Sequence, residues 1–213
     1  MANIAFSCPD ASFEDVWPAS AFSSKNTTPY YQSWVERLVT GGITSGCDSR
    51  TIDFNGVTDF IYRYYCPEDT VTRAQMAVFF EKGIHGPFFL PPVVSPSFSD
   101  TTGHWAANWI EALKNDNVTS GCMPGLCCPE NPVIRTQMAV FLLKSKHEPS
   151  YSPPPATGTV FVDVPTGYWA TDWTESLLSE NITSGCGIDI YCPENPVTRG
   201  QMSIFLVRTF NLP

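Results

Sequence analysis

Cysteine and arginine recur in this sequence at spacings that could support specific chemistry. Six of the eight cysteines stand in pairs on either side of a loop: Cys47 with Cys66, Cys122 with Cys128, and Cys186 with Cys192. An arginine follows each pair within the same motif, at Arg73, Arg135 and Arg199. Paired thiols can form disulfides, and a guanidinium can bind a carboxylate through two parallel hydrogen bonds. Three of only seven arginines therefore occupy one repeated position, which favours a specific role.

The cysteine pattern favours disulfides over a zinc site. A zinc site needs four ligands at metal-like spacing, but there is no C-x-x-C, and the three histidines do not recur with the cysteines. We predict one bridge within each pair, an oxidising location and no metal. Two cysteines remain, Cys8 and Cys127. We favour a bridge between them that ties the N-terminal arm to the second repeat; a bridge between molecules or free thiols are the alternatives.

These residues belong to three internal repeats that span the chain. The segments GGITSGC, DNVTSGC and ENITSGC each follow an aromatic-rich run, and a motif that begins CPE and continues R-x-Q-M comes after each of them. We predict one domain over 1–213, with repeats at 9–85, 98–146 and 161–213 and proline-rich linkers at 86–97 and 147–160. Each repeat should fold as helix, loop and helix, and the first helix of repeat 2 should end near Asn115 and Asp116.

The second helix of each repeat has a recognisable start. Thr72 with Gln75 and Thr198 with Gln201 fit a capping box, whereas Ile134 breaks that pattern in repeat 2. Apolar residues at helical spacing follow, and three repeats can bury these stripes against one another. The insertion SRTIDFNGVTDFIYRYY in repeat 1 alternates in places and predicts a short hairpin.

Composition excludes several classes of protein. The chain has 213 residues, 21 acidic and 12 basic side chains and a net charge of −9. A sequence-independent nucleic-acid binder or a polybasic membrane-surface protein needs the opposite balance. No apolar run reaches the length that spans a bilayer, and the N-terminus does not read as a signal peptide. Because no triad, P-loop or metalloprotease motif is present, we expect no enzyme and no cofactor.

The order of motifs resembles the S-layer homology family. It runs F-x-D, W-A with a helix, I-T-x-G, a loop that ends in proline, and V-T-R-A-Q, and the three copies cover nearly the whole chain. The loop from Gly185 to Pro193 has the length of the family loop and places Tyr191 at its aromatic position. Where the family has Thr-Arg-Ala-Glu, this chain has glutamine at Gln75, Gln137 and Gln201.

The resemblance implies both a fold and a function. The fold would be mainly α, a pseudo-threefold spindle of three helix-loop-helix repeats around a central three-helix bundle. The function would be non-covalent anchoring to cell-wall polysaccharide, often a pyruvylated polymer, in grooves between repeats. By position in the repeat, the carbohydrate-binding candidates are Arg73, Arg135, Arg199, Asp15, Asp100, Asp163, Tyr30, Trp105 and Trp169. The alternative for each arginine is an ion pair with the aspartate of its own or a neighbouring repeat, which would hold the spindle together.

Two functions from different classes follow. The first is a carbohydrate-binding anchor of the extracellular cell envelope, with cell-wall polysaccharide as its partner. The second is a structural protein that self-assembles or decorates a surface layer, an extracellular filament or a virion surface. The sequence shows no cargo domain and has two odd cysteines, both of which favour assembly. The family resemblance favours the anchor.

Overall fold

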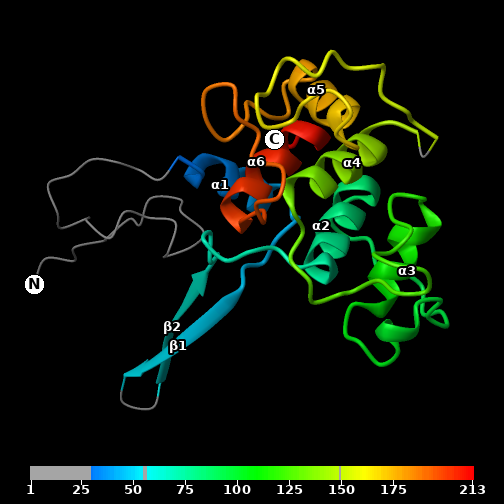
Figure 1. Ribbon diagram of the computed structural model, residues 1–213. Coiled ribbons are helices and arrows are strands. Elements are labelled where there is room, and N and C mark those ends of the chain that lie inside the picture. The colour runs from blue at the N-terminus through cyan, green and yellow to red at the C-terminus, as the bar shows by residue number, and fades with distance from the viewer. Residues whose placement is uncertain (1–29, 55–56, 149) are drawn as a thin grey trace, which may run out of the picture.

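The computed structural model describes residues 30–54, 57–148 and 150–213 (Figure 1). The elements are α1 (Gln32–Thr40), β1 (Asp48–Phe54), β2 (Val57–Tyr64), α2 (Arg73–His85), the 3-10 helix η2 (Ser99–Thr101), α3 (Ala107–Asn115), α4 (Arg135–Lys146), α5 (Thr171–Ser179) and α6 (Arg199–Phe210). The mainly α class is confirmed. None of the helices in the described ranges is both long and apolar enough to span a membrane.

Each first helix packs mainly on a helix of another repeat rather than on the second helix of its own. Helix α3 packs on α2, α5 packs on α4, and α1 packs on α6. Helices α2, α4 and α6 contact one another through apolar faces, and the Phe80 ring meets the rings of Phe141 and Phe210. Thus each first helix covers the second helix of the preceding repeat, and the last repeat is covered by the first.

Three short segments close this arrangement into a ring. The backbone N–H of Val71 donates to the carbonyl of Val197, Val197 donates to Val133, and Val133 donates to Val71, each at 2.9 Å. All three valines are fully buried. Two residues further along, the direction reverses: the valines donate to the preceding repeat, whereas Arg73, Arg135 and Arg199 each donate a backbone N–H to the next repeat.

The predicted helix boundaries agree with the structure. Helix α3 ends at Asn115, and α2 begins with a complete capping box between Thr72 and Gln75. Thr198 caps α6 in the same way, although the described contacts include no return bond from Gln201. Ile134 provides no side-chain cap, yet α4 still begins at the equivalent residue because the adjoining valine ring fixes the chain there.

The insertion in repeat 1 is the predicted hairpin. Strands β1 and β2 pair antiparallel from Asp48 opposite Tyr64 to Phe54 opposite Val57. The hairpin projects away from the helices in Figure 1, and the bridge between Cys47 and Cys66 closes its base.

Glutamates of the first helices fasten the two linkers. Glu111 in α3 accepts hydrogen bonds from the backbone N–H and the hydroxyl of Ser97. Glu175 in α5 accepts the backbone N–H groups of Thr157 and Gly158. The linkers are therefore held against the helices at defined points.

Candidate functional site

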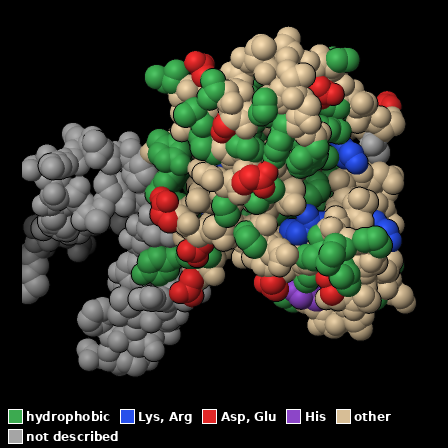
Figure 2. Space-filling view, viewed as in Figure 1, with side chains coloured by type: hydrophobic (Ala, Val, Ile, Leu, Met, Phe, Trp, Pro, Cys, Tyr) green, Lys and Arg blue, Asp and Glu red, His purple; other side chains and the backbone are tan. Residues whose placement is uncertain are grey.

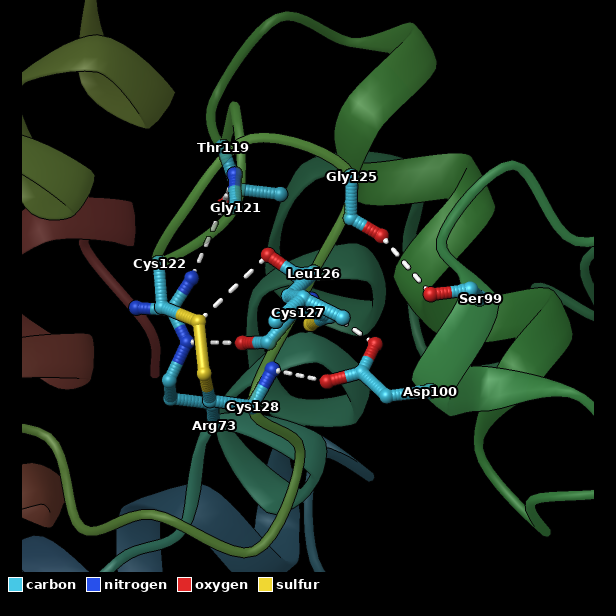
Figure 3. Close-up of a disulfide and its surroundings, with 10 residues drawn as sticks. All are labelled: Arg73, Ser99, Asp100, Thr119, Gly121, Cys122, Gly125, Leu126, Cys127 and Cys128. Carbon is cyan, nitrogen blue, oxygen red and sulfur yellow. Dashed lines mark hydrogen bonds between the residues drawn. A yellow bond between two sulfur atoms is a disulfide. The ribbon is translucent and has the colours of Figure 1, made fainter.

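The bridged loops of repeats 2 and 3 are each held by a disulfide and an aspartate, and Figure 3 shows the loop of repeat 2. In repeat 2, Cys122 bonds to Cys128. The two carboxylate oxygens of Asp100 accept the backbone N–H groups of Cys127 at 2.9 Å and Cys128 at 2.7 Å. Asp163 accepts the corresponding groups of Tyr191 and Cys192 in repeat 3.

The chemical environment of Asp100 favours its charged form. Burial opposes ionisation, but the two backbone hydrogen bonds and the nearby Arg73 guanidinium outweigh it and hold the pKa of this carboxyl below its usual value. The structure therefore assigns Asp100 and Asp163 to loop fastening, and neither residue lines the two grooves described below. Asp15 lies outside the described residues.

The three bridges predicted within the cysteine pairs are all present. The second cysteine of each pair has a positive φ, at Cys66, Cys128 and Cys192. This left-handed conformation is uncommon for residues other than glycine. Its recurrence means that the three loops end in the same local backbone conformation.

The predicted bridge between Cys8 and Cys127 is not formed. Cys127 is a free, buried thiol, and Cys8 lies outside the described residues. Cys127 occupies the repeat position of Tyr65 and Tyr191, both fully buried. Its side chain therefore points into the core, where a partner cysteine would have to enter the interior to reach it.

The three arginines begin helices α2, α4 and α6 and lie beneath the loop of the next repeat. Each Nε donates to a loop carbonyl: Arg73 to Cys127 at 2.6 Å, Arg135 to Tyr191 at 2.7 Å and Arg199 to Tyr65 at 2.7 Å. Their exposed fractions are only 3 to 4%. These contacts give the arginines a structural role between repeats, and the groups that they contact are carbonyls rather than the aspartates considered above.

Aromatic rings enclose two of these guanidinium groups. The Arg135 guanidinium carbon lies 4.9 Å from the Tyr191 ring centroid and 5.5 Å from that of Phe205. Arg199 lies similarly between Tyr65 and Phe79. Such stacking suits the planar, weakly hydrated guanidinium. The tyrosines complete the arrangement by donating their hydroxyls to the backbone carbonyls of the same arginines.

A large groove lies beside Arg135, and we call it the repeat-3 groove. Its volume is about 520 Å³, within the range of small-molecule sites. Its walls come from all three repeats: Tyr30, Trp34, Arg135, the loop 182–186, Gln201, Ile204, Phe205 and Arg208. The Tyr30 ring is 64% exposed and available to a ligand face.

A second groove, the repeat-1 groove, has the same construction one repeat further round. It has a volume of about 300 Å³. Its walls are the loop 43–47, Gln75, Val78, Phe79, Lys82, Trp105 and Arg199. Each groove thus combines one repeat's loop and second helix with the arginine of the preceding repeat and the exposed ring of the following one. Trp169 is also exposed and occupies that ring position in repeat 3.

The guanidinium groups of Arg135 and Arg73 differ in how fully they are bonded. Nη2 of Arg73 donates to the Thr119 hydroxyl at 3.2 Å. Nη2 of Arg135 is buried and has no hydrogen-bond partner among the described residues. Burial also lowers the pKa of Arg135, although the group stays charged at neutral pH. A buried cation with an unused donor beside a groove is a favourable site for an anion.

One repeated cation escaped the sequence analysis. Nine residues after the arginine, each second helix carries a base, at Lys82, Lys144 and Arg208. Lys82 lines the repeat-1 groove and Arg208 lines the repeat-3 groove. Arg208 also lies over the Trp34 ring, with 5.1 Å between its guanidinium carbon and the ring centroid. Aligning the repeats through the ends of the helices would have revealed this position.

Charge is otherwise sparse on the surface in view. Figure 2 shows hydrophobic side chains at the surface over α5 and α6, acidic groups scattered between them, and few, isolated basic groups. The pairing of a deep arginine with a basic side chain at the rim therefore makes the repeat-3 groove locally cationic in an acidic protein.

Comparison with known proteins gives distant relatives. No family model matches the chain. An S-layer protein of Bacillus thuringiensis subsp. finitimus is 27% identical over 144 residues, which is 67% of this chain and 17% of that protein. The S-layer protein sap of Bacillus anthracis is 28% identical over the same shares. An uncharacterized cell wall amidase of Bacillus anthracis is 28% identical over 54% of this chain and 21% of its own length. The matches thus span about a fifth or less of each relative.

Proposed function

We propose that this chain is a non-catalytic module of the S-layer homology type that binds a carboxylate-bearing cell-wall polysaccharide in its repeat-3 groove. Distant homology to S-layer proteins supports a cell-surface, structural role and an extracellular location at the envelope. The ring of valines and the mutual packing of α2, α4 and α6 support one spindle that spans 1–213, with repeats at 9–85, 98–146 and 161–213.

The unpartnered Nη2 of Arg135 is the observation that carries the proposal. The guanidinium is already held through its Nε, so its charge can attract a carboxylate in the groove, and a local movement would let the buried Nη2 donate to that carboxylate. Arg208 at the rim adds a second cation, and the exposed Tyr30 ring can cover the apolar face of a sugar. A sugar that carries a pyruvyl ketal has both a carboxylate for the cations and a ring face for Tyr30.

The grooves are not equivalent, and this makes the proposal specific. In repeat 2 the Thr119 hydroxyl accepts a hydrogen bond from Nη2 of Arg73. This guanidinium therefore has one donor fewer to offer an anion. All three repeats have glutamine where the family has glutamate, and in the repeat-3 groove this residue is Gln201. Loss of a negative charge beside Arg135 strengthens its attraction for an anionic ligand.

Sedimentation of the protein with isolated cell-wall polysaccharide tests the proposal. Binding should require the pyruvyl group and should weaken about tenfold in Arg208→Gln and in Tyr30→Ser. Both side chains are exposed, so these variants should fold normally. Lys144→Gln is the matched control, because it removes the basic side chain at the same repeat position in repeat 2, where the Thr119 hydroxyl already accepts from the Arg73 guanidinium. Equal binding by all three variants would refute the assignment of the groove.

Assembly is the second candidate function. In the linker 86–97 the most exposed large apolar side chains are Phe88 at 94%, Leu90 at 81% and Val93 at 89%. Exposed apolar groups of this density often mark contact surfaces. If the chain self-associates through this linker, a variant with serine at all three positions should sediment as a monomer where the wild type forms larger species. A wild type that is monomeric at high concentration would exclude this function.

The homology to an amidase brings no enzymatic proposal. The match covers only 21% of that protein, and the groove residues described above form no nucleophile and base pair. A hydrolysis assay on wall fragments should therefore give no product.

A further inference from the structure

A buried glutamate stands apart from the repeat pattern. Glu81 in α2 is fully buried, and neither carboxylate oxygen has a hydrogen-bond partner among the described residues. The same position holds Leu143 in α4 and Val207 in α6, both buried core residues. A buried carboxylate without hydrogen bonds is costly, so its presence where the other repeats use apolar residues calls for compensation by neighbouring groups.

Two metal-ligating groups face this carboxylate. His85 follows one turn later on α2, and its Nε2 lies 3.5 Å from Oε2 of Glu81. Asp116 comes from the end of α3, and its Oδ2 lies 2.6 Å from the same nitrogen. The three ligand atoms all fall within 4.8 Å of one another. Donors bound tetrahedrally to one zinc ion lie about 3.3 Å apart, so a small widening of the His85–Asp116 pair admits an ion.

The surroundings also suit an ion. The His85 ring stacks on Phe89 with 4.4 Å between centroids, which holds the imidazole in place. The side chains of His85 and Asp116 are about one third exposed, so water can reach the site and complete the coordination.

We propose that Glu81, His85 and Asp116 form a binding site for a divalent transition-metal ion of the zinc type. The imidazole distinguishes such an ion from calcium or magnesium, which prefer oxygen ligands. The ion would join the end of α2 to the end of α3 and so connect repeat 1 to repeat 2. Neither cysteine spacing nor recurrence in the sequence marks this site, because its ligands include no cysteine and come together at one place only among the described residues.

Repeat 2 provides a natural control. His147 contacts Glu180 at 2.8 Å and stacks on Tyr151, as His85 does with Asp116 and Phe89. There, however, Leu143 takes the position of Glu81 and Lys146 pairs with the carboxylate at 2.9 Å. The histidine–acid contact is thus common to both repeats, and the third ligand is special to the first.

Calorimetric titration of the disulfide-bonded protein with zinc tests the site. We expect one equivalent to bind, with a rise in melting temperature that calcium does not produce. His85→Ala and Glu81→Leu should each weaken the affinity at least tenfold, whereas His147→Ala should leave it unchanged. Glu81→Leu introduces the residue of repeat 2, so circular dichroism should show a normally folded protein.

Cobalt provides an independent readout. Its visible spectrum should show coordination by nitrogen and oxygen without thiolate charge-transfer bands, which separates this site from binding at Cys127. Absence of stoichiometric zinc binding, equal binding of calcium, or affinity unchanged in Glu81→Leu would each overturn the proposal.

Discussion

Replacing Asp100 with asparagine should destabilise the protein by breaking one of two hydrogen bonds. Each oxygen of Asp100 accepts one backbone N–H, from Cys127 and from Cys128. Asparagine keeps one acceptor oxygen, but its NH₂ group would face the second backbone N–H, so that hydrogen bond is lost. A hydrogen bond to a charged group contributes about 1.5–3 kcal/mol, and solvent at this exposed side chain reduces it to about 1–2 kcal/mol. The melting temperature should fall by about 3–6 °C.

The pH dependence provides the sharper measurement. The folded-state pKa of Asp100 is depressed, so its contribution is complete above the unfolded value of about 4 and is lost as pH falls through the folded pKa. The free-energy difference between wild type and Asp100→Asn, measured by urea unfolding, should be constant above about pH 5 and shrink below about pH 4. Asparagine does not titrate, so the change must come from the wild type.

Asp189→Asn is the matched control. It makes the same change of charge at an exposed carboxylate that accepts no hydrogen bond from the described residues, and its effect should stay within about 0.5 kcal/mol. Equal stability of Asp100→Asn and wild type at neutral pH would refute the loop-fastening role, as would a difference that persists unchanged at pH 2.

Three further changes test separate parts of the fold. Serine at both Cys186 and Cys192, six residues apart, should cost about 2–2.5 kcal/mol in urea unfolding, and an unchanged midpoint would contradict the loop-closure argument. Tyr191→Phe removes a buried hydroxyl that donates to a helix carbonyl and should cost about 1 kcal/mol by thermal unfolding; no loss would mean that the bond is energetically neutral. Gly83→Ala places a Cβ 2.3 Å from the Phe210 ring and should lower the melting temperature despite better helix propensity; a rise would show that the ring moves freely.

The repeat pattern made much of the fold predictable because its signals were local. The capping residue Thr72, the hairpin and the bridge between Cys186 and Cys192 depend on neighbours in sequence, and the structure has all three. What sequence could not supply was the partner of each repeat. Arg135 meets the loop of repeat 3, and this contact depends on the cyclic order of packing, which no spacing within one repeat encodes.

The candidate sites, like the fold, were predictable in part from the sequence. The alignment identified the buried arginines and the exposed rings of Tyr30 and Trp105, which the structure places beside the grooves. The alignment could not show whether Asp100 fastens a loop or faces a ligand, because the F-x-D motif that contains it is compatible with either role. Glu81 could not be predicted from the repeat, because Leu143 and Val207 occupy its position in the other two copies.

The ring of Val71, Val133 and Val197 has a consequence for the order in which the chain can fold. Synthesis proceeds from the N-terminus, but the N–H of Val71 donates to the carbonyl of Val197, which is synthesised 126 residues later. The carbonyl of Tyr65 likewise accepts a hydrogen bond from Nε of Arg199, which is synthesised much later. A nascent chain that lacks its last helix therefore holds two repeats that cannot close. Contacts of such long sequence separation fold slowly and together. We expect ribosome-bound or C-terminally truncated chains to stay protease-sensitive until residue 199 and the helix after it become available.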